Sequence, residues 1–164
     1  MPAILFICTA NQFRSPIAAA SFAQVLSSSR NPDTWKIASA GTWTTSGLPA
    51  HPKAVIAAST IGLDITNHQT QEVNSEFINE FDLIVVMENN HKESLELEFP
   101  QTLGKIVILG QIANVPDGEI PDPAKDAFTN SDAVAELINS SIKQTFSKLV
   151  QLTLLLHDGF SPII

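Results

Sequence analysis

Four short apolar runs, separated by longer stretches with helical spacing, constrain the fold of this chain more than any other feature. The runs cover 3–7, 35–38, 83–87 and 105–109, and each has the length of a buried strand. Helices are expected over 52–61 and 90–99 and from residue 131 onward. Strands that alternate with helices predict a parallel sheet covered on both faces. We therefore expect the α/β class, as a three-layer α/β/α sandwich with a four-stranded parallel sheet.

Composition and charge narrow the class of protein. The 164 residues are 44% hydrophobic and 16% charged, which is typical of one globular domain over 1–164. The net charge is −8, from 9 basic and 17 acidic residues, and no run of Lys or Arg stands out. A nucleic-acid groove and an anionic membrane surface are therefore not expected as partners.

Cys8 is the single cysteine of the chain. One thiol forms no internal disulfide and supplies no structural zinc cage, so we expect no bound metal and a reducing compartment. The N-terminus lacks the charged start and apolar stretch of an export signal, and no apolar run reaches the roughly 18 residues of a membrane span. These features predict a soluble cytoplasmic protein.

Cys8 lies where the first apolar run ends, in the stretch "FICTANQFRSP". Pro16 suits the first turn of a helix, so a short loop joins a strand to a helix N-terminus and directs its amides at one point. The spacing Cys-x5-Arg allows this loop to curl around a phosphate-sized anion, with the Arg14 guanidinium as a bidentate clamp. We therefore expect a phosphate-binding loop after the first strand.

The same environment would stabilise a thiolate, so we expect Cys8 to be an ionised nucleophile that accepts a hydrogen bond from Ser15. Taken alone, the pattern Cys-x5-Arg favours a core cysteine and a surface arginine. Its position after the first apolar run and the Ser-Pro that follows shift the balance toward the phosphate-binding loop. The Gly-x-x-x-x-Gly-Lys-Ser/Thr pattern is absent, which argues against nucleotide hydrolysis.

A phosphocysteine route needs a group that first protonates the leaving oxygen and then activates water. Asp122 is the candidate, because it precedes a proline in the rigid stretch "IPDPAKDAF". Asp117 beside Gly118 is better explained as turn chemistry, and Asp126 as a solvated loop charge.

These motifs resemble those of the low-molecular-weight protein tyrosine phosphatases, whose signatures are Cys-x-Gly-Asn-x-x-Arg-Ser-Pro and a later Asp-Pro. They read "CTANQFRSP" and "PDPAKDAF" in this chain, and the resemblance extends through "SAGTWTTSGLPAHPKAV", "GLDITNH" and "DLIVVMENN". It covers nearly the whole chain in the expected order.

The resemblance implies roles for matching positions. Cys8 would be the nucleophile, Arg14 the phosphate clamp, Ser15 the thiolate partner and Asp122 the acid and then the base. The remaining implied positions are the phosphate-binding and substrate-binding residues Thr9, Ala10, Asn11, Gln12, Phe13 and Trp43 and the bracing residues Asn11, Ser39 and His68. Taken alone, His68 is better explained as a surface histidine or a satisfied buried one, and Trp43 is equally a core residue.

The chain also departs from the family pattern. Ala10 replaces a usual glycine and is expected to crowd the loop, Phe13 replaces a second cysteine, and Ala124 replaces an aromatic residue. Gln12 fits neither the phosphotyrosine nor the phosphoarginine members well. Two alternatives stay open: an arsenate reductase on the same scaffold, which one cysteine argues against, and a non-catalytic binder of phosphate or phosphopeptides.

The favoured interpretation is a cofactor-free phosphomonoesterase. Its substrates would be phosphorylated proteins, carrying phosphotyrosine or phosphoarginine, or small aryl phosphates. We expect it to be a monomer or a weak dimer.

Overall fold

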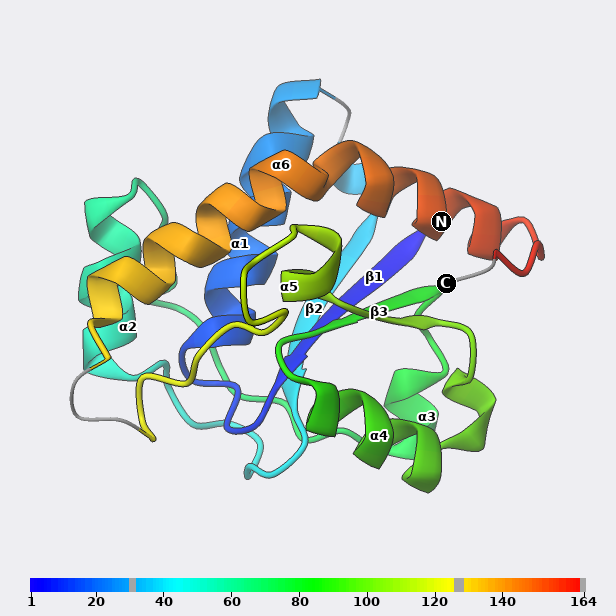
Figure 1. Ribbon diagram of the computed structural model, residues 1–164, viewed down its shortest axis with the longest axis horizontal. Helices are drawn as coiled ribbons and strands as arrows, with labels where there is room; N and C mark the ends of the chain where they lie inside the picture. The colour runs from blue at the N-terminus through cyan, green and yellow to red at the C-terminus, as the bar shows by residue number, and fades with distance from the viewer. Residues whose placement is uncertain (30–31, 126–128, 163–164) are drawn as a thin grey trace.

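The fold is a parallel sheet between two layers of helices, as a computed structural model shows (Figure 1). The structure describes residues 1–29, 32–125 and 129–162. The strands are β1 (Ala3–Cys8), β2 (Lys36–Gly41), β3 (Leu83–Val86) and β4 (Ile106–Ile108). They pair in the order β2-β1-β3-β4, and every pairing is parallel. The predicted sandwich is thus confirmed, although β2 and β4 each begin one residue later than expected.

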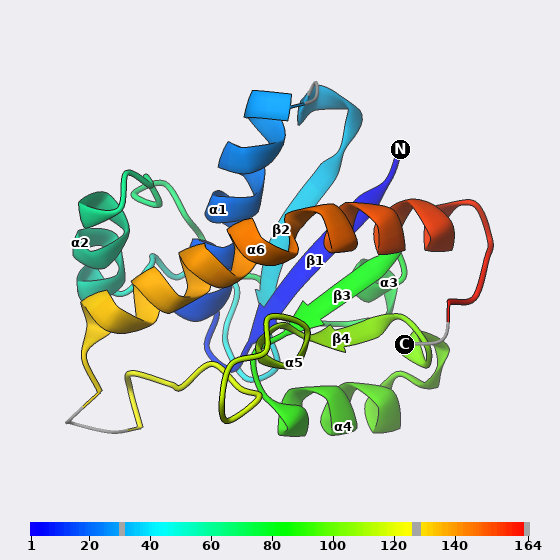
Figure 2. The same cartoon turned by 45° about the horizontal axis from the view of Figure 1, so that its top comes forward.

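Helices cover both faces of the sheet. The helices are α1 (Arg14–Ser29), α2 (Pro52–Thr60), α3 (Ser75–Ile78), α4 (Asn89–Glu98), α5 (Leu109–Ile112) and α6 (Ser131–His157), with 3-10 turns η1 (Pro32–Thr34) and η2 (Pro100–Thr102). Helices α1, α2, α5 and α6 cover one face of the sheet, and α3 and α4 cover the opposite face. In Figure 2, α6 crosses in front of the strands and α3 lies behind them. The short helices α3 and α5 were not expected from the sequence.

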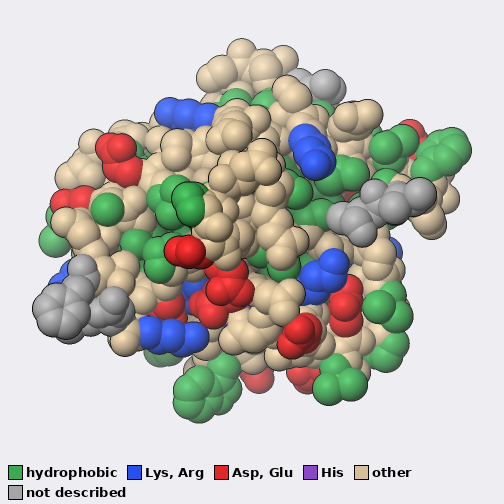
Figure 3. Space-filling view, in the orientation of Figure 1, with side chains coloured by type: hydrophobic (Ala, Val, Ile, Leu, Met, Phe, Trp, Pro, Cys, Tyr) green, Lys and Arg blue, Asp and Glu red, His purple; other side chains and the backbone are tan. Residues whose placement is uncertain are grey.

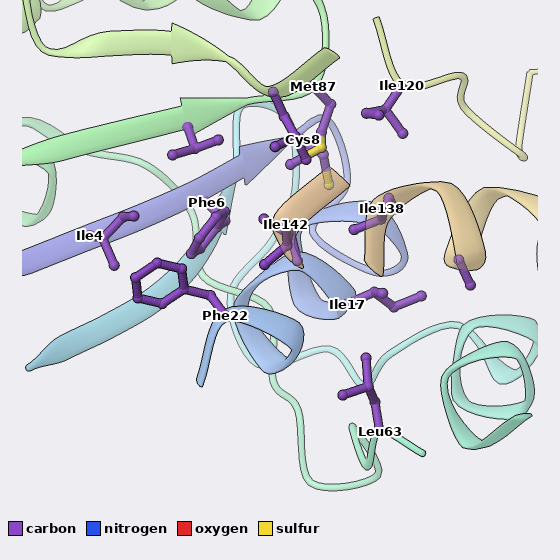
Figure 4. Close-up of a cluster of buried hydrophobic side chains, with 14 of the residues drawn as sticks. Ile4, Phe6, Cys8, Ile17, Phe22, Leu63, Met87, Ile120, Ile138 and Ile142 are labelled. Atoms are coloured by element: carbon purple, nitrogen blue, oxygen red, sulfur yellow. The ribbon is translucent and has the colours of Figure 1, made fainter. Parts of the chain in front are cut away.

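The central strand β1 is buried on both sides, which explains why its sequence is apolar throughout. Ile4, Phe6 and Cys8 belong to the core cluster under α1 and α6, and the alternate residues face α3 and α4. Phe6 packs on Phe22 of α1 with ring centroids 5.7 Å apart. Figure 4 shows this cluster, with Cys8 beside Met87 at one end of it.

Local sequence signals determine where the long helices begin. Asn130 caps α6, and its Oδ1 accepts hydrogen bonds from the N–H groups of Asp132 (2.9 Å) and Ala133 (3.1 Å). His51 caps α2, which starts with Pro52. Within the described residues, no helix is both long and apolar enough to cross a membrane.

The carboxyl ends of the four strands lie along one edge of the sheet, where ligands bind in open parallel sheets. The loop after β1 and the segment after β2 touch there, because Thr42 and Trp43 donate backbone hydrogen bonds to the carbonyls of Cys8 and Thr9, both at 3.0 Å. A Cβ at Gly41 would lie 2.6 Å from the Thr9 carbonyl oxygen. This contact explains why β2 ends in a glycine.

Candidate active site

The loop from Cys8 to the start of α1 places the thiol and a hydroxyl together. Cys8 is 3% exposed, and its Sγ atom lies 3.0 Å from Ser15 Oγ. Its other neighbours are the apolar residues of the core, among them Met87 and Ile120 (Figure 4). The sulfur therefore lies at the boundary between the core and the cavity described below.

The Ser15 hydroxyl has one proton and three polar neighbours. Its Oγ accepts a hydrogen bond from Asn11 Nδ2 at 2.8 Å, and it lies 3.3 Å from the Ala40 carbonyl and 3.0 Å from Cys8 Sγ. A hydroxyl normally lies about 2.7–2.8 Å from an oxygen acceptor, so the carbonyl is a poor acceptor here. The Ser15 hydroxyl therefore donates its proton toward Cys8 Sγ rather than toward the carbonyl.

Asn11 holds the loop in its shape. It is fully buried and has a φ of 55°, a left-handed conformation that asparagine tolerates better than most residues. Its Nδ2 also donates to Ser39 Oγ (2.9 Å), and its Oδ1 accepts from the Gln71 N–H (2.9 Å). His68 Nε2 donates to the Asn11 carbonyl at 2.7 Å. The three residues expected to brace the loop thus lie together.

His68 is neutral in this arrangement. Burial lowers the pKa of its imidazole below the ordinary value, and the hydrogen bond to the Asn11 carbonyl opposes this only in part. Since a carbonyl only accepts, the ring proton must be on Nε2. The neutral ring therefore satisfies the loop without adding a charge beneath it.

The Arg14 guanidinium is almost completely buried, at 2% exposure, and faces two carboxylates. Its Nη1 donates to Glu88 and, at 2.9 Å, to the Ile120 carbonyl. Its Nη2 lies 3.2 Å from Asp122 Oδ2. Within the described residues, Nε makes no hydrogen bond, so the Nε–Nη2 edge is the side left for an anion.

Glu88 is a site residue that the sequence interpretation missed. Burial raises the pKa of its carboxyl, but the hydrogen bond and charge of Arg14, with smaller help from Lys125, outweigh burial and leave the pKa lowered. Glu88 is therefore ionised at neutral pH and pairs with Arg14. It directly follows Met87 at the end of a buried strand, and a polar residue at that position was the signal that could have revealed it.

His91 was also missed, and it connects Glu88 to the phosphate-binding loop. Its Nδ1 accepts the Glu88 backbone N–H at 3.1 Å, and its Nε2 lies 2.9 Å from Thr9 Oγ1. Burial, with a further contribution from the Arg14 charge, lowers the pKa of His91 to about 4. The imidazole is thus neutral and donates from Nε2 to Thr9.

Asp122 comes from the loop after α5. Its Oδ1 accepts the Ala124 N–H at 2.9 Å, which orients the other oxygen toward Arg14. Asp117, by contrast, is exposed and does not line the cavity. Asp126 lies outside the described residues.

Cys8 and Arg14 open into a cavity of about 620 Å³. Of the remaining predicted residues, it is lined by Thr9, Ala10, Gln12, Phe13, Trp43 and Asp122. His51, Lys53, Pro123 and Ser131 also line it and were not predicted, and Ala124 lines it at the position where the family has an aromatic residue. Ser131 is the first residue of α6, so the C-terminal helix also contributes to the cavity.

Three predicted loop and wall residues have informative surroundings. Trp43 is 84% exposed, so core packing does not account for it. Ala10 is exposed and, unlike Asn11, has no positive φ, so its backbone does not require a glycine. Gln12 donates from Nε2 to the Pro49 carbonyl at 3.0 Å, which ties the loop to the segment before α2.

Comparison with known proteins agrees with this geometry. A sequence model of the low molecular weight phosphotyrosine protein phosphatases matches residues 3–153. The probable low molecular weight protein-tyrosine-phosphatase EpsP of Ralstonia nicotianae is 31% identical over 139 residues, which are 85% of this chain and 90% of that protein.

Two solved structures are also similar. Tyrosine phosphatase Wzb from Escherichia coli K30, in complex with sulphate, superposes with a TM-score of 0.79 at 31% identity, over 90% of this chain and 98% of its own. The YwlE arginine phosphatase from Geobacillus stearothermophilus superposes with a TM-score of 0.78 at 26% identity, over 94% of this chain and 96% of its own.

Proposed function

The chain belongs to the low molecular weight phosphotyrosine protein phosphatases, and from this premise we propose that it hydrolyses phosphotyrosine in proteins through a phosphocysteine on Cys8. The observation that carries the proposal is the 3.0 Å separation of Cys8 Sγ and Ser15 Oγ in a cavity that also contains Arg14 and Asp122. A hydroxyl proton directed at the sulfur stabilises a thiolate, which is the nucleophilic form.

The first chemical step transfers the phosphoryl group to Cys8. The sulfur forms a bond to phosphorus while the bond from phosphorus to the tyrosine oxygen breaks, and that oxygen receives the Asp122 proton as it leaves. The Nε–Nη2 edge of Arg14 holds two of the phosphoryl oxygens as negative charge spreads over them.

The second step returns the enzyme to its starting state. Asp122, now ionised, takes a proton from water, and the water oxygen bonds to phosphorus as the phosphorus–sulfur bond breaks. Phosphate and the Cys8 thiolate result, and Asp122 is protonated again. No electron transfer is involved, so the step needs no second thiol.

An aromatic phosphate suits this cavity better than an aliphatic one. Trp43 is exposed beside the site, where its indole can stack on the ring of a bound phosphotyrosine. The relatives include both tyrosine and arginine phosphatases, and Ala124 adds no second aromatic group to the cavity. We therefore take Trp43 as the main support for phosphotyrosine over phosphoarginine.

The test is turnover with trapping of the intermediate. The wild-type chain should hydrolyse an aryl phosphate, and rapid acid quenching should leave one phosphoryl group on the peptide that contains Cys8. Cys8→Ser should lose both signals, whereas Ser59→Ala, at an exposed position of α2, should retain both. Turnover without labelled Cys8, or an active Cys8→Ser variant, would contradict the proposed route.

A second comparison decides the substrate. Phosphotyrosine and phosphoarginine versions of one peptide should differ in kcat/KM, with phosphotyrosine preferred, and Trp43→Ala should reduce that preference. A higher rate on phosphoarginine would reverse the substrate assignment and leave the chemical route intact.

The cytoplasmic location and the oligomeric state expected from the sequence remain predictions. The single cysteine, which is free, suits the reducing cytoplasm. The oligomeric state is expected to be a monomer or weak dimer, which light scattering after size-exclusion chromatography would measure.

A further inference from the structure

The start of α2 presents two basic groups to the active-site cavity. The side chains of His51 and Lys53 line the same cavity as Cys8 and Arg14. We propose that His51 and Lys53 form a cationic corner that binds a second anionic group of the substrate, next to the phosphorylated residue. This inference rests on the proposed function, since it names the class of phosphoprotein that the site prefers.

The cationic corner is firmly attached to the phosphate-binding loop. The His51 N–H donates to the Gln12 carbonyl at 2.9 Å, and the Gln12 side chain returns a hydrogen bond to the Pro49 carbonyl at 3.0 Å. The figures agree that α2 lies beside the start of α6, whose first residue lines the cavity too (Figures 1 and 2). The corner therefore keeps a fixed position relative to Cys8.

The His51 ring is held so that it can donate. Its Nδ1 accepts the Lys53 backbone N–H at 3.1 Å, so Nε2 is the ring nitrogen that carries a proton. No described residue accepts a hydrogen bond from Nε2. An oxygen of a bound substrate is a suitable acceptor for it.

Lys53 lies where a lysine is unfavourable for the helix. The N-terminus of a helix carries partial positive charge and favours acidic side chains, yet the first turn of α2 has none and contains Lys53. No carboxylate in the described residues lies within 4.0 Å of its ammonium group. Lys105, Lys143 and Lys148 also lack such a partner there, but Lys53 lines the active-site cavity and they do not. A placement that costs helix stability without an ion pair points to a ligand.

The positive charge at the start of α2 is not part of a larger basic surface. The chain carries a net charge of −8, and acidic and basic side chains are interspersed on the face that Figure 3 shows. Asp122 is the one carboxylate among the residues that line the cavity, and it already faces Arg14. A second anion bound near α2 therefore meets Lys53 without a competing acidic group among the lining residues.

The occupant is a carboxylate of a flanking Asp or Glu, or a second phosphate on a neighbouring residue. Both present oxygen acceptors and negative charge to the same two donors. Exposed pairs of this kind contribute modestly, so we expect a preference of about two- to fivefold for one extra carboxylate. A doubly charged phosphate should increase the preference further.

The experiment measures binding, so that it does not depend on turnover. Peptides with a non-hydrolysable phosphonate in place of phosphotyrosine carry flanking Glu, isosteric flanking Gln, or a second phosphonate. Calorimetry compares them on the wild-type chain, on Lys53→Met and on Lys148→Met, an exposed lysine of α6 that does not line the cavity. A fourth protein, His51→Asn, keeps a good helix cap while removing the imidazole.

The expected result is a Glu-over-Gln preference in the wild-type chain that disappears in Lys53→Met, falls in His51→Asn and persists in Lys148→Met. Added salt should weaken the preference. Equal Glu-to-Gln affinity ratios in the wild-type chain and Lys53→Met would overturn the inference, even if an aryl phosphate is hydrolysed. If the preference is present but no phosphate ester is hydrolysed, the cationic corner stands and the proposed function fails.

The melting temperature of each variant shows whether a lost preference results from misfolding. Because Lys53 opposes the helix dipole, Lys53→Met should melt at the same temperature as the wild-type chain or higher. A lost preference together with an unchanged or raised melting temperature supports the cationic corner. A lost preference with a lowered melting temperature in every Lys53 variant, Lys53→Gln included, would count against it.

Discussion

Glu88, two residues after β3, holds the buried guanidinium of Arg14 at Nη1, on the side opposite its Nε–Nη2 edge. Arg14 is 2% exposed, so this carboxylate supplies charge compensation that solvent does not. The pair fixes the guanidinium orientation before an anion arrives. Glu88 is thus best described as a positioning residue for Arg14.

Glu88→Gln should lower affinity for oxyanions and slow turnover, because an amide keeps the hydrogen bond but removes the charge that holds Arg14. We expect kcat/KM to fall about 10- to 100-fold and the free energy of unfolding to fall by about 1–3 kcal/mol. The inhibition constant of inorganic phosphate reports the orientation of Arg14 separately from stability. Glu96→Gln, on α4 and paired with Lys92, is the control. An unchanged phosphate inhibition constant in Glu88→Gln would remove the positioning role.

His91 predicts how folding stability depends on pH. The unfolded chain protonates this residue near pH 6.5, but the folded chain does so only near 4, so acidification through that interval favours the unfolded chain. Stability should fall by about 2 kcal/mol between pH 7.5 and pH 5 on account of His91. His68 contributes in the same direction.

Urea unfolding at pH 7.5, 6 and 5 measures this effect. His91→Gln can still accept the Glu88 N–H and donate to Thr9, and it should show a shallower pH dependence than the wild-type chain. A steeper or unchanged dependence in that variant would mean that the acid sensitivity arises elsewhere.

Asp122→Asn tests the acid and base role. The amide keeps the hydrogen bond from the Ala124 N–H but cannot donate a carboxyl proton. We expect a loss of about 10²- to 10⁴-fold for phosphate esters with poor leaving groups and a much smaller loss for p-nitrophenyl phosphate. Asp117→Asn, in the exposed turn, should match the wild-type chain. Equal losses for good and poor leaving groups would argue against proton donation by Asp122.

Two substitutions of Asn11, by alanine and by glycine, should differ in their effect on the free energy of unfolding. Asn11→Ala removes three side-chain hydrogen bonds and leaves a Cβ at a φ of 55°, so we expect a loss of roughly 3 kcal/mol. Asn11→Gly removes the same bonds but accepts that φ freely, and it should be about 1 kcal/mol more stable than the alanine variant. Urea unfolding gives both values. The reverse order would show that the left-handed conformation is not retained.

The parts of this molecule that depend on local sequence were predictable. The apolar runs predicted the strands, and the position of Cys8 between β1 and Pro16 predicted the loop and its nucleophile. Glu88 and His91 were not predicted, because their roles depend on which strand lies beside β1, and β3 is more than 70 residues away in the chain. Lys53 is similar: its own helix gives no hint that its side chain reaches the cavity, which depends on the hydrogen bonds at Gln12.

The hydrogen bonds that join Gln12 to the segment before α2 use only backbone atoms of that segment, at Pro49 and His51. Substitution of the segment's side chains therefore leaves these bonds in place, while the groups that carry out the reaction lie on the sheet edge beneath. During divergence of related chains, the preference for what surrounds the phosphorylated residue can drift independently of the catalytic steps. A library of variants restricted to the side chains of the segment before α2 could therefore change which substrates the enzyme prefers while the catalytic residues stay the same.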